Sequence, residues 1–206
     1  MIVAVVVATV MAAAGEAFVA RWPEPSTARP LRGALMGVSA GACAWIVTHG
    51  ALDHAPRLVT GSRGVLCGAM VILAVVDWRV HRLPDVITLP TFVITAVMIC
   101  FGGGPVLHAF IGAGVYFAAL GIIHVIKPSG MGFGDVKLAL GLGLQLGWLD
   151  VRLVLHGLTA ASLFGVLIGM VQIGRKRGKA FAFGPAMCAG TVVVIALSSR
   201  ILASLG

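Results

Sequence analysis

Long apolar runs, separated by short segments rich in proline, glycine and charge, make up almost the whole chain. Most of them approach the roughly 20 residues that a helix needs to cross a bilayer. None shows the alternation of apolar and polar residues that is typical of a half-buried strand. The pattern therefore predicts an all-α, polytopic integral membrane protein with about eight transmembrane helices, at residues 1–20, 33–49, 64–78, 86–102, 105–126, 135–148, 151–173 and 181–203.

The composition excludes a separate soluble domain. Hydrophobic residues make up 59% of the 206 residues and charged residues only 11%, with a mean hydropathy of +1.05. A soluble domain carries about 25% charged residues to cover its surface. We therefore expect residues 1–206 to form one transmembrane domain in contact with lipid, in which 21–32 is a short cytoplasmic loop.

The fifteen lysines and arginines predict the orientation of the helices. Eleven lie in or beside the odd-numbered connections, and four lie beside the even-numbered connections or near the C-terminus. Because cytoplasmic loops carry the excess of positive charge, the odd connections are predicted to be cytoplasmic and both termini to lie outside. The net charge of +8 is split into short clusters between apolar runs, so we predict no nucleic-acid partner.

The cysteines give no indication of a metal or redox centre. Cys43, Cys67, Cys100 and Cys188 each stand alone in an apolar run, and the sequence contains no C-x-x-C pair. A zinc knuckle or a redox dithiol is therefore unsupported. We expect buried, inert thiols, and we predict neither a metal nor a cofactor.

Three of the seven acidic residues, Asp77, Asp85 and Asp135, fall at predicted cytoplasmic helix ends. Carboxylates near hydrocarbon are costly, which makes them functional candidates. Asp85 follows Pro84 at a helix boundary, so its carboxylate is expected to cap the free N–H groups of the next helix. The other four acids are interpreted as loop or membrane-surface charges.

Asp77 and Asp135 stand at the ends of two helices that are predicted to be short. The run 135–148 has 14 residues, about 21 Å of helix against roughly 30 Å of hydrocarbon. The run 64–78 is similarly confined between Arg63 and Arg79. Three glycines before Asp135 permit positive φ angles and close helix approach. The two carboxylates are thus expected below the headgroup level, beside irregular backbone that lines a watery cavity. A flexible loop that feeds a capped helix is the plainer alternative.

Two carboxylates that are close together in a partly desolvated site do not both ionise readily, so one can act as a base and the other as an acid. Such a pair can activate water and protonate a leaving amine, which is peptide hydrolysis without a metal or a covalent intermediate. Asp77 and Asp135 are 58 residues apart in the sequence, so their pairing is a hypothesis.

These segments resemble the type IV prepilin peptidase family, the membrane aspartic proteases of the G-x-G-D kind. The strongest match is G-M-G-F-G-D-V-K-L at 130–138, around the family's second catalytic aspartate. The segment D-W-R-V-H-R-L-P-D at 77–85 resembles the segment around the first, and A-F-G-P at 182–185 is a weaker match. The resemblance covers most of the chain from about residue 64 and implies that Asp77 and Asp135 are catalytic.

Six further residues are expected to shape or support the site: Gly132, Gly134, Asp85, Lys137, Gly184 and Pro185. Lys137 could act on Asp135 or on an acidic group of the substrate, and a plain charge at a helix end is an equal alternative. Pro185 could shape the cavity wall, but proline is also common in the first turn of any helix.

The resemblance implies an aspartic endopeptidase of the inner membrane that cleaves the leader peptide of prepilins or pseudopilins on the cytoplasmic side. Many bacterial members carry a larger cytoplasmic domain with two cysteine pairs and also N-methylate the new terminus. Here 21–32 takes the place of that domain and contains no cysteine, so methyltransferase activity is not expected. An oligomeric state is not predicted.

Two alternatives compete with this interpretation. A presenilin-like intramembrane protease shares G-x-G-D, but it should have a tyrosine beside its first aspartate and a later P-A-L element. Here Val76 precedes Asp77, and no P-A-L occurs. A small proton-coupled transporter would also keep carboxylates among glycine-broken helices, but it should show an internal repeat, which the sequence lacks.

Overall fold

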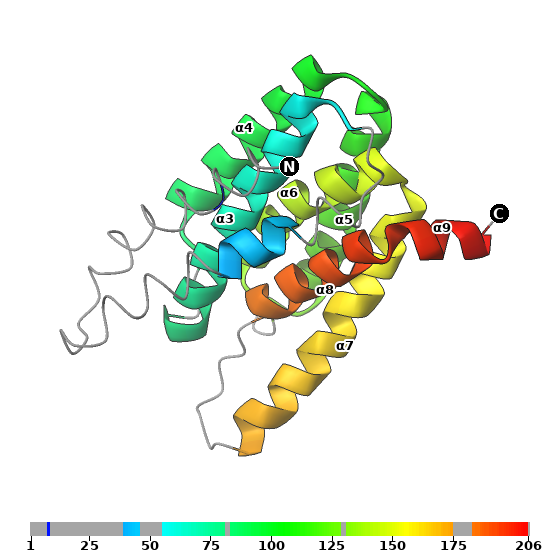
Figure 1. Cartoon of the computed structure of the whole chain (residues 1–206). Helices are drawn as coiled ribbons and strands as arrows, with labels where there is room; N and C mark the ends of the chain where they lie inside the picture. Colours follow the sequence, from blue (N-terminus) through cyan, green and yellow to red (C-terminus); the bar gives the residue numbers. More distant parts are fainter. Residues whose placement is uncertain are drawn as a thin grey trace.

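The computed structural model of the chain describes residues 8, 39–45, 55–80, 83–128, 131–174 and 183–205. Most of these residues are helical and none of them lies in a strand, which confirms the all-α prediction. Figure 1 shows the arrangement of the labelled helices, which are α3 (Arg57–Val80), α4 (Asp85–Gly102), α5 (Val106–Ile126), α6 (Phe133–Leu149), α7 (Arg152–Gly174), α8 (Gly184–Ala196) and α9 (Ser198–Leu205).

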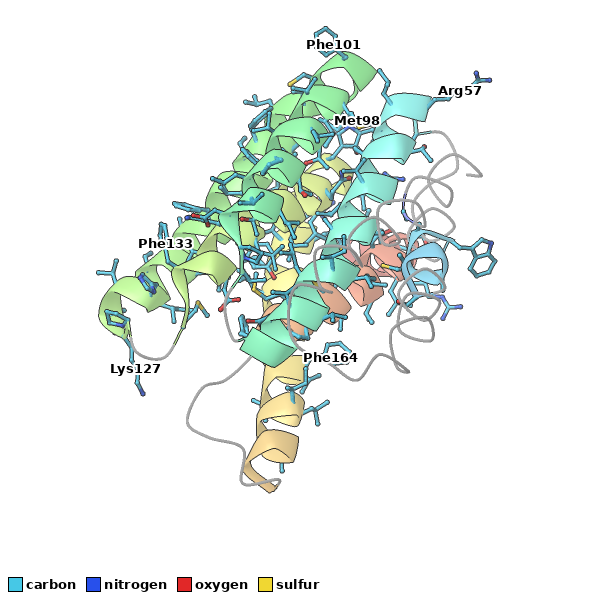
Figure 2. All side chains as sticks on the ribbon, turned by 90° about the vertical axis from the view of Figure 1, so that its left-hand side faces the viewer. Arg57, Met98, Phe101, Lys127, Phe133 and Phe164 are labelled. Carbon is cyan, nitrogen blue, oxygen red and sulfur yellow. The ribbon has the colours of Figure 1, made fainter. Side chains whose placement is uncertain are left out.

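Successive helices from α3 to α6 run up and down. Figure 2 shows Arg57 and Phe101 at one end of the bundle and Lys127 and Phe133 toward the other. The most extensive contacts are those of α5 with α6, α7 with α8 and α3 with α4. The buried share of the apolar stretch is 78% for α3, against 22% for α4 and 28% for both α5 and α7. The helix α3 is therefore central, and the other three present apolar surface outward.

Four of the described helices, α3, α4, α5 and α7, are long and apolar enough to cross a membrane, and α8 with α9 forms a fifth span if the bent pair is counted as one. The helix α6 has 17 residues, about 25 Å, so it is short for a span, as the sequence predicted. Most of the first two predicted helices, 1–20 and 33–49, lies outside the described residues, apart from the helical stretch 39–45.

Two predicted helices differ from the structure. The third is not short, because α3 begins at Arg57 and continues through Arg63, whose side chain is 2% exposed and whose guanidinium lies 5.1 Å from the ring centroid of Trp148. A cation that packs on an aromatic face does not need to mark a membrane boundary. The last predicted helix is broken, since α8 and α9 meet at an angle of 66°. Ser198 and Ser199 follow the break, and serine pairs are common at sharp kinks.

Glycines bring α5 and α6 into backbone contact. A Cβ atom added to Gly112 would lie 2.5 Å from the carbonyl oxygen of Gly143 and 2.6 Å from the Cα of Gly147. Small residues spaced four apart let membrane helices approach closely. This contact explains why the apolar runs here contain so much glycine.

The four cysteines are free thiols, but they are not equally buried. Cys67 and Cys188 are buried as predicted, and Cys43 is partly buried. Cys100 is exposed on α4, so the prediction of a buried thiol is wrong there. An apolar neighbourhood in the sequence does not distinguish the outer face of a membrane helix from its inner face.

Candidate active site

The two predicted catalytic aspartates lie at the same end of the bundle. Asp77 is in the last turn of α3 and is 5% exposed, and Asp135 is in the first turn of α6 and is 6% exposed. The charge of Asp77 acts on the Asp135 carboxyl, and both carboxylates act on the thiol of Cys188 in α8. Three helices that are distant in the sequence thus bring two buried carboxyl groups to one place.

The start of α8 holds Asp77. The backbone N–H of Gly184 donates a hydrogen bond to Oδ2 of Asp77, at 2.9 Å. The first N–H groups of a helix have no partner within the helix, so they suit a carboxylate. A Cβ atom on Gly184 would lie 2.8 Å from the same oxygen, so glycine is required for this approach. Pro185 takes the first helical turn, in agreement with the plainer of its two interpretations.

The glycines around Asp135 act through close approach. Gly132 has φ −70° and ψ 144°, an ordinary extended conformation, so it does not use the positive φ that glycine permits. Gly132 is the N-cap of α6, and its carbonyl oxygen accepts a hydrogen bond from the N–H of Asp135 at 3.1 Å. Gly134 lies against Leu83, where an added Cβ would be 2.7 Å from the Leu83 Cβ. The first glycine of the motif, Gly130, lies outside the described residues.

The side chain of Asp135 is only partly engaged. Its Oδ1 atom is buried and has no hydrogen-bond partner among the residues that the structure describes. Nearly all buried polar atoms in proteins are paired, so an orphaned carboxylate oxygen calls for an explanation. At this position it is an acceptor that a water molecule or a substrate group can use.

Asp85 and Lys137 form an ion pair beside the aspartates. Nζ of Lys137 lies 2.7 Å from Oδ2 of Asp85 and also lies over the ring of Phe133. The N-cap of α4 is Pro84, and no side chain caps this helix. The prediction that Asp85 caps α4 is therefore wrong, because the carboxylate pairs across to α6. The ammonium of Lys137 bonds to Asp85 rather than to Asp135.

Sequence reasoning missed two residues of this region. Leu83 packs on Gly134, as described above. His124, near the end of α5, donates from Nδ1 to the carbonyl oxygen of Met131 at 2.8 Å, and its ring lies 5.5 Å from that of Phe133. A carbonyl accepts only, so Nδ1 carries the hydrogen. A polar ring in the last turn of an apolar helix, just before the glycine-rich loop, was the available signal.

An apolar pocket of about 450 Å³ lies between the end of α5 and the start of α6. Phe133 and Val136 of α6 line it together with residues of α5 that include Phe117 and Gly121. Phe133 and Val136 stand on either side of Asp135 in the sequence. Apolar surface that can be filled is therefore available next to the candidate site.

The segments that contain these residues match a known protein family. The sequence model of the Type IV leader peptidase family matches residues 64–170, which include Asp77, Asp85, Asp135 and Lys137. The chain belongs to this family. Gly184 and Pro185 lie beyond the match.

Three relatives are bacterial proteins named prepilin leader peptidase/N-methyltransferase. The protein of Escherichia coli (strain K12) is 31% identical over 144 residues, which is 66% of this chain and 63% of that protein. The protein of Neisseria gonorrhoeae is 29% identical, over 77% of this chain and 54% of that protein. The protein of Pseudomonas putida is 29% identical, over 68% of this chain and 50% of that protein. The chain thus spans about half to two thirds of these relatives. No solved structure matches it.

Proposed function

We propose that this member of the Type IV leader peptidase family is a membrane aspartic endopeptidase that cleaves the leader peptide of type IV prepilins or pseudopilins. The observation that carries the proposal is the pair of buried carboxyl groups, Asp77 and Asp135, which interact at one end of the bundle. Both lie in segments that the family shares. The relatives named above are leader peptidases, which supports prepilin-like substrates for this chain.

In the proposed mechanism the two aspartates share the work of acid and base. One aspartate, ionised, takes a proton from a water molecule as that water attacks the scissile carbonyl carbon, and the other, protonated, gives its proton to the leaving amine. The hydrogen bond from Gly184 fixes the orientation of Asp77. Oδ1 of Asp135, which has no hydrogen-bond partner among the described residues, is the acceptor for the water or for a substrate donor. Burial excludes bulk water, which strengthens these polar interactions.

We infer a multi-pass protein of the inner membrane, with eight spans, both termini outside and the active site toward the cytoplasm. The described helices that can cross a membrane support the location, and the bias of lysine and arginine supports the orientation. We also propose a peptidase that does not methylate its product, in which 21–32 replaces the larger cytoplasmic domain of other members. That loop lies outside the described residues.

The test is cleavage of a prepilin from the same genome, co-expressed with the full chain and followed by gel shift. Asp77→Asn and Asp135→Asn should each reduce cleavage by about 10⁴-fold or more, the loss that is usual for a residue that acts in the chemical step. Asp150→Asn is the control, since Asp150 is an acidic residue at the opposite end of α6. Immunoblots of the membrane fraction check that each variant accumulates.

The outcomes distinguish the proposed aspartate pair, a protease with other catalytic residues, and a transporter. Loss of cleavage in both aspartate variants and normal cleavage in the control supports the pair. An active Asp77→Asn variant would show that the pairing is wrong even if the chain is a protease. A wild-type chain that leaves every prepilin uncut would favour the proton-coupled transporter instead.

A further inference from the structure

We propose that Leu83, Asp85 and Lys137 form a clamp that positions Asp135 for catalysis. The clamp joins Leu83 and the first residue of α4 to the first two turns of α6. This inference rests on the proposed peptidase function and adds positioning residues to it, which act on the reaction only through Asp135.

The first contact of the clamp is steric. Leu83 is 9% exposed and lies directly against Gly134, the residue before Asp135. A Cβ atom on Gly134 would lie 2.7 Å from the Cβ of Leu83 and 3.4 Å from its backbone N and O. The backbone at Gly134 therefore has no room to move toward α4.

The second contact is electrostatic and lies just beyond Asp135. Lys137 is two residues further along α6, and its Nζ is 2.7 Å from Oδ2 of Asp85. Its side chain is only 21% exposed and also covers the Phe133 ring. The Asp85 side chain is 54% exposed, so the pair acts by fixing Lys137 across two helices rather than by a large energy of its own. The two contacts thus hold the backbone on both sides of Asp135 to the same short segment.

The clamp also ties the two catalytic aspartates to each other. Leu83 and Asp85 follow Asp77 in the chain by six and eight residues. Two residues that closely follow one carboxylate in the chain therefore contact the helix that carries the other. Displacing a reacting group by about 1 Å can cost about 100-fold in rate. Loss of the ion pair should accordingly reduce kcat without changing substrate affinity.

The experiment measures kcat and KM of the purified full-length chain on a prepilin substrate. The single variants are Asp85→Asn and Lys137→Gln, and the double variant Asp85→Lys with Lys137→Asp exchanges the two charges. We expect each single variant to lower kcat about tenfold, a coupling of ordinary size for neighbouring residues, with KM and the pH profile unchanged. The charge exchange should recover most of the loss.

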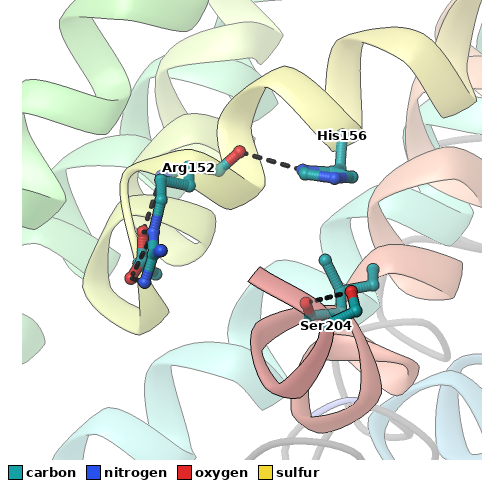
Figure 3. A network of polar contacts seen from close by, with 5 residues as sticks. Arg152, His156 and Ser204 are labelled. Atoms are coloured by element: carbon teal, nitrogen blue, oxygen red, sulfur yellow. Dashed lines mark hydrogen bonds and ion pairs between the residues drawn. The ribbon is translucent and has the colours of Figure 1, made fainter. Parts of the chain in front are cut away.

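Arg152→Gln is the matched control. Arg152 forms an exposed ion pair with Asp150 at 3.0 Å, at the opposite end of α6 (Figure 3). The guanidinium of Arg152 holds the pKa of the Asp150 carboxyl below its usual value, so this pair is also formed in the folded chain. Its removal should leave kcat within about twofold of the wild type.

Normal kcat in both single variants would overturn the clamp, and so would a loss that the charge exchange does not repair. A rise in KM at constant kcat would also overturn it, since it would place the pair in substrate binding. If the double variant does not accumulate in the membrane, Lys137→Arg decides, because it retains the charge and should keep kcat near the wild type. A wild-type chain that leaves the prepilin uncut would refute the proposed function instead.

Discussion

The hydrogen bond between α8 and Asp77 gives a sharp prediction for Gly184→Ala. The added Cβ would lie 2.8 Å from Oδ2, 3.3 Å from Cγ and 3.5 Å from Cβ of Asp77. Ordinary contact begins at 3.4 Å, so the carboxylate or the start of α8 must move by about 0.6 Å. Both partners are buried backbone or a short side chain, so neither can swing away.

We expect kcat of Gly184→Ala to fall between about 10-fold and 100-fold, because a 1 Å displacement of a reacting group costs about 100-fold. The assay is leader cleavage by purified enzyme, with the thermal midpoint measured on the same sample. Alanine is a better helix former than glycine, so the variant should fold.

The matched control for this prediction is Gly114→Ala. Gly114 is a helical glycine of α5 at which an added Cβ would meet nothing within 4 Å. Its kcat should equal that of the wild type. A Gly184→Ala enzyme with normal kcat would refute the view that α8 positions Asp77.

Two further predictions concern the surroundings of the site. In Gly147→Ala the new Cβ would lie 2.8 Å from the Cα of Gly112. Over-packing of this kind costs about 1–3 kcal/mol, so the thermal midpoint should fall by several degrees. The control Gly121→Ala, whose Cβ would lie 3.8 Å from its nearest neighbour, should not lower the midpoint. An unchanged midpoint would contradict the close contact of α5 and α6. His124→Phe keeps a ring beside Phe133 but removes the hydrogen bond to Met131, so kcat should fall several-fold. The control His156→Phe removes the hydrogen bond to the Arg152 carbonyl (Figure 3) and should leave kcat unchanged. Equal kcat in both histidine variants would show that the bond to Met131 does not order the loop.

Much of the fold can be predicted from the sequence because helices that cross a membrane correspond to long apolar runs. The described helices from α4 to α7 begin and end within a few residues of the predicted positions. The two aspartates of the proposed catalytic pair could also be found in the sequence, since carboxylates are rare in such runs and the two segments resemble one family. Their proximity was not, because residues 58 apart in the chain are brought together only by packing.

The errors have one physical origin, which is contact between distant segments. Arg63 looked like a boundary charge until Trp148 of α6 supplied an aromatic face for it. Asp85 looked like a helix cap until Lys137, 52 residues away, supplied a cation. Local patterns establish which side chains are costly to bury, but not which distant partner offsets that cost.

The glycine contact between α5 and α6 determines which parts of the molecule can yield when a substrate arrives. At Gly112, Gly143 and Gly147 the two backbones touch with no side chain between them, so a change of rotamer there cannot let the helices slide. We therefore expect α5 and α6 to move as one rigid unit that carries Asp135 at its end. Room for an incoming peptide should then come from the opposite side, where the N–H of Gly184 at the start of α8 bonds to Asp77. An inhibitor that separates α8 from α3 would then block the proposed peptidase activity without displacing α5 or α6.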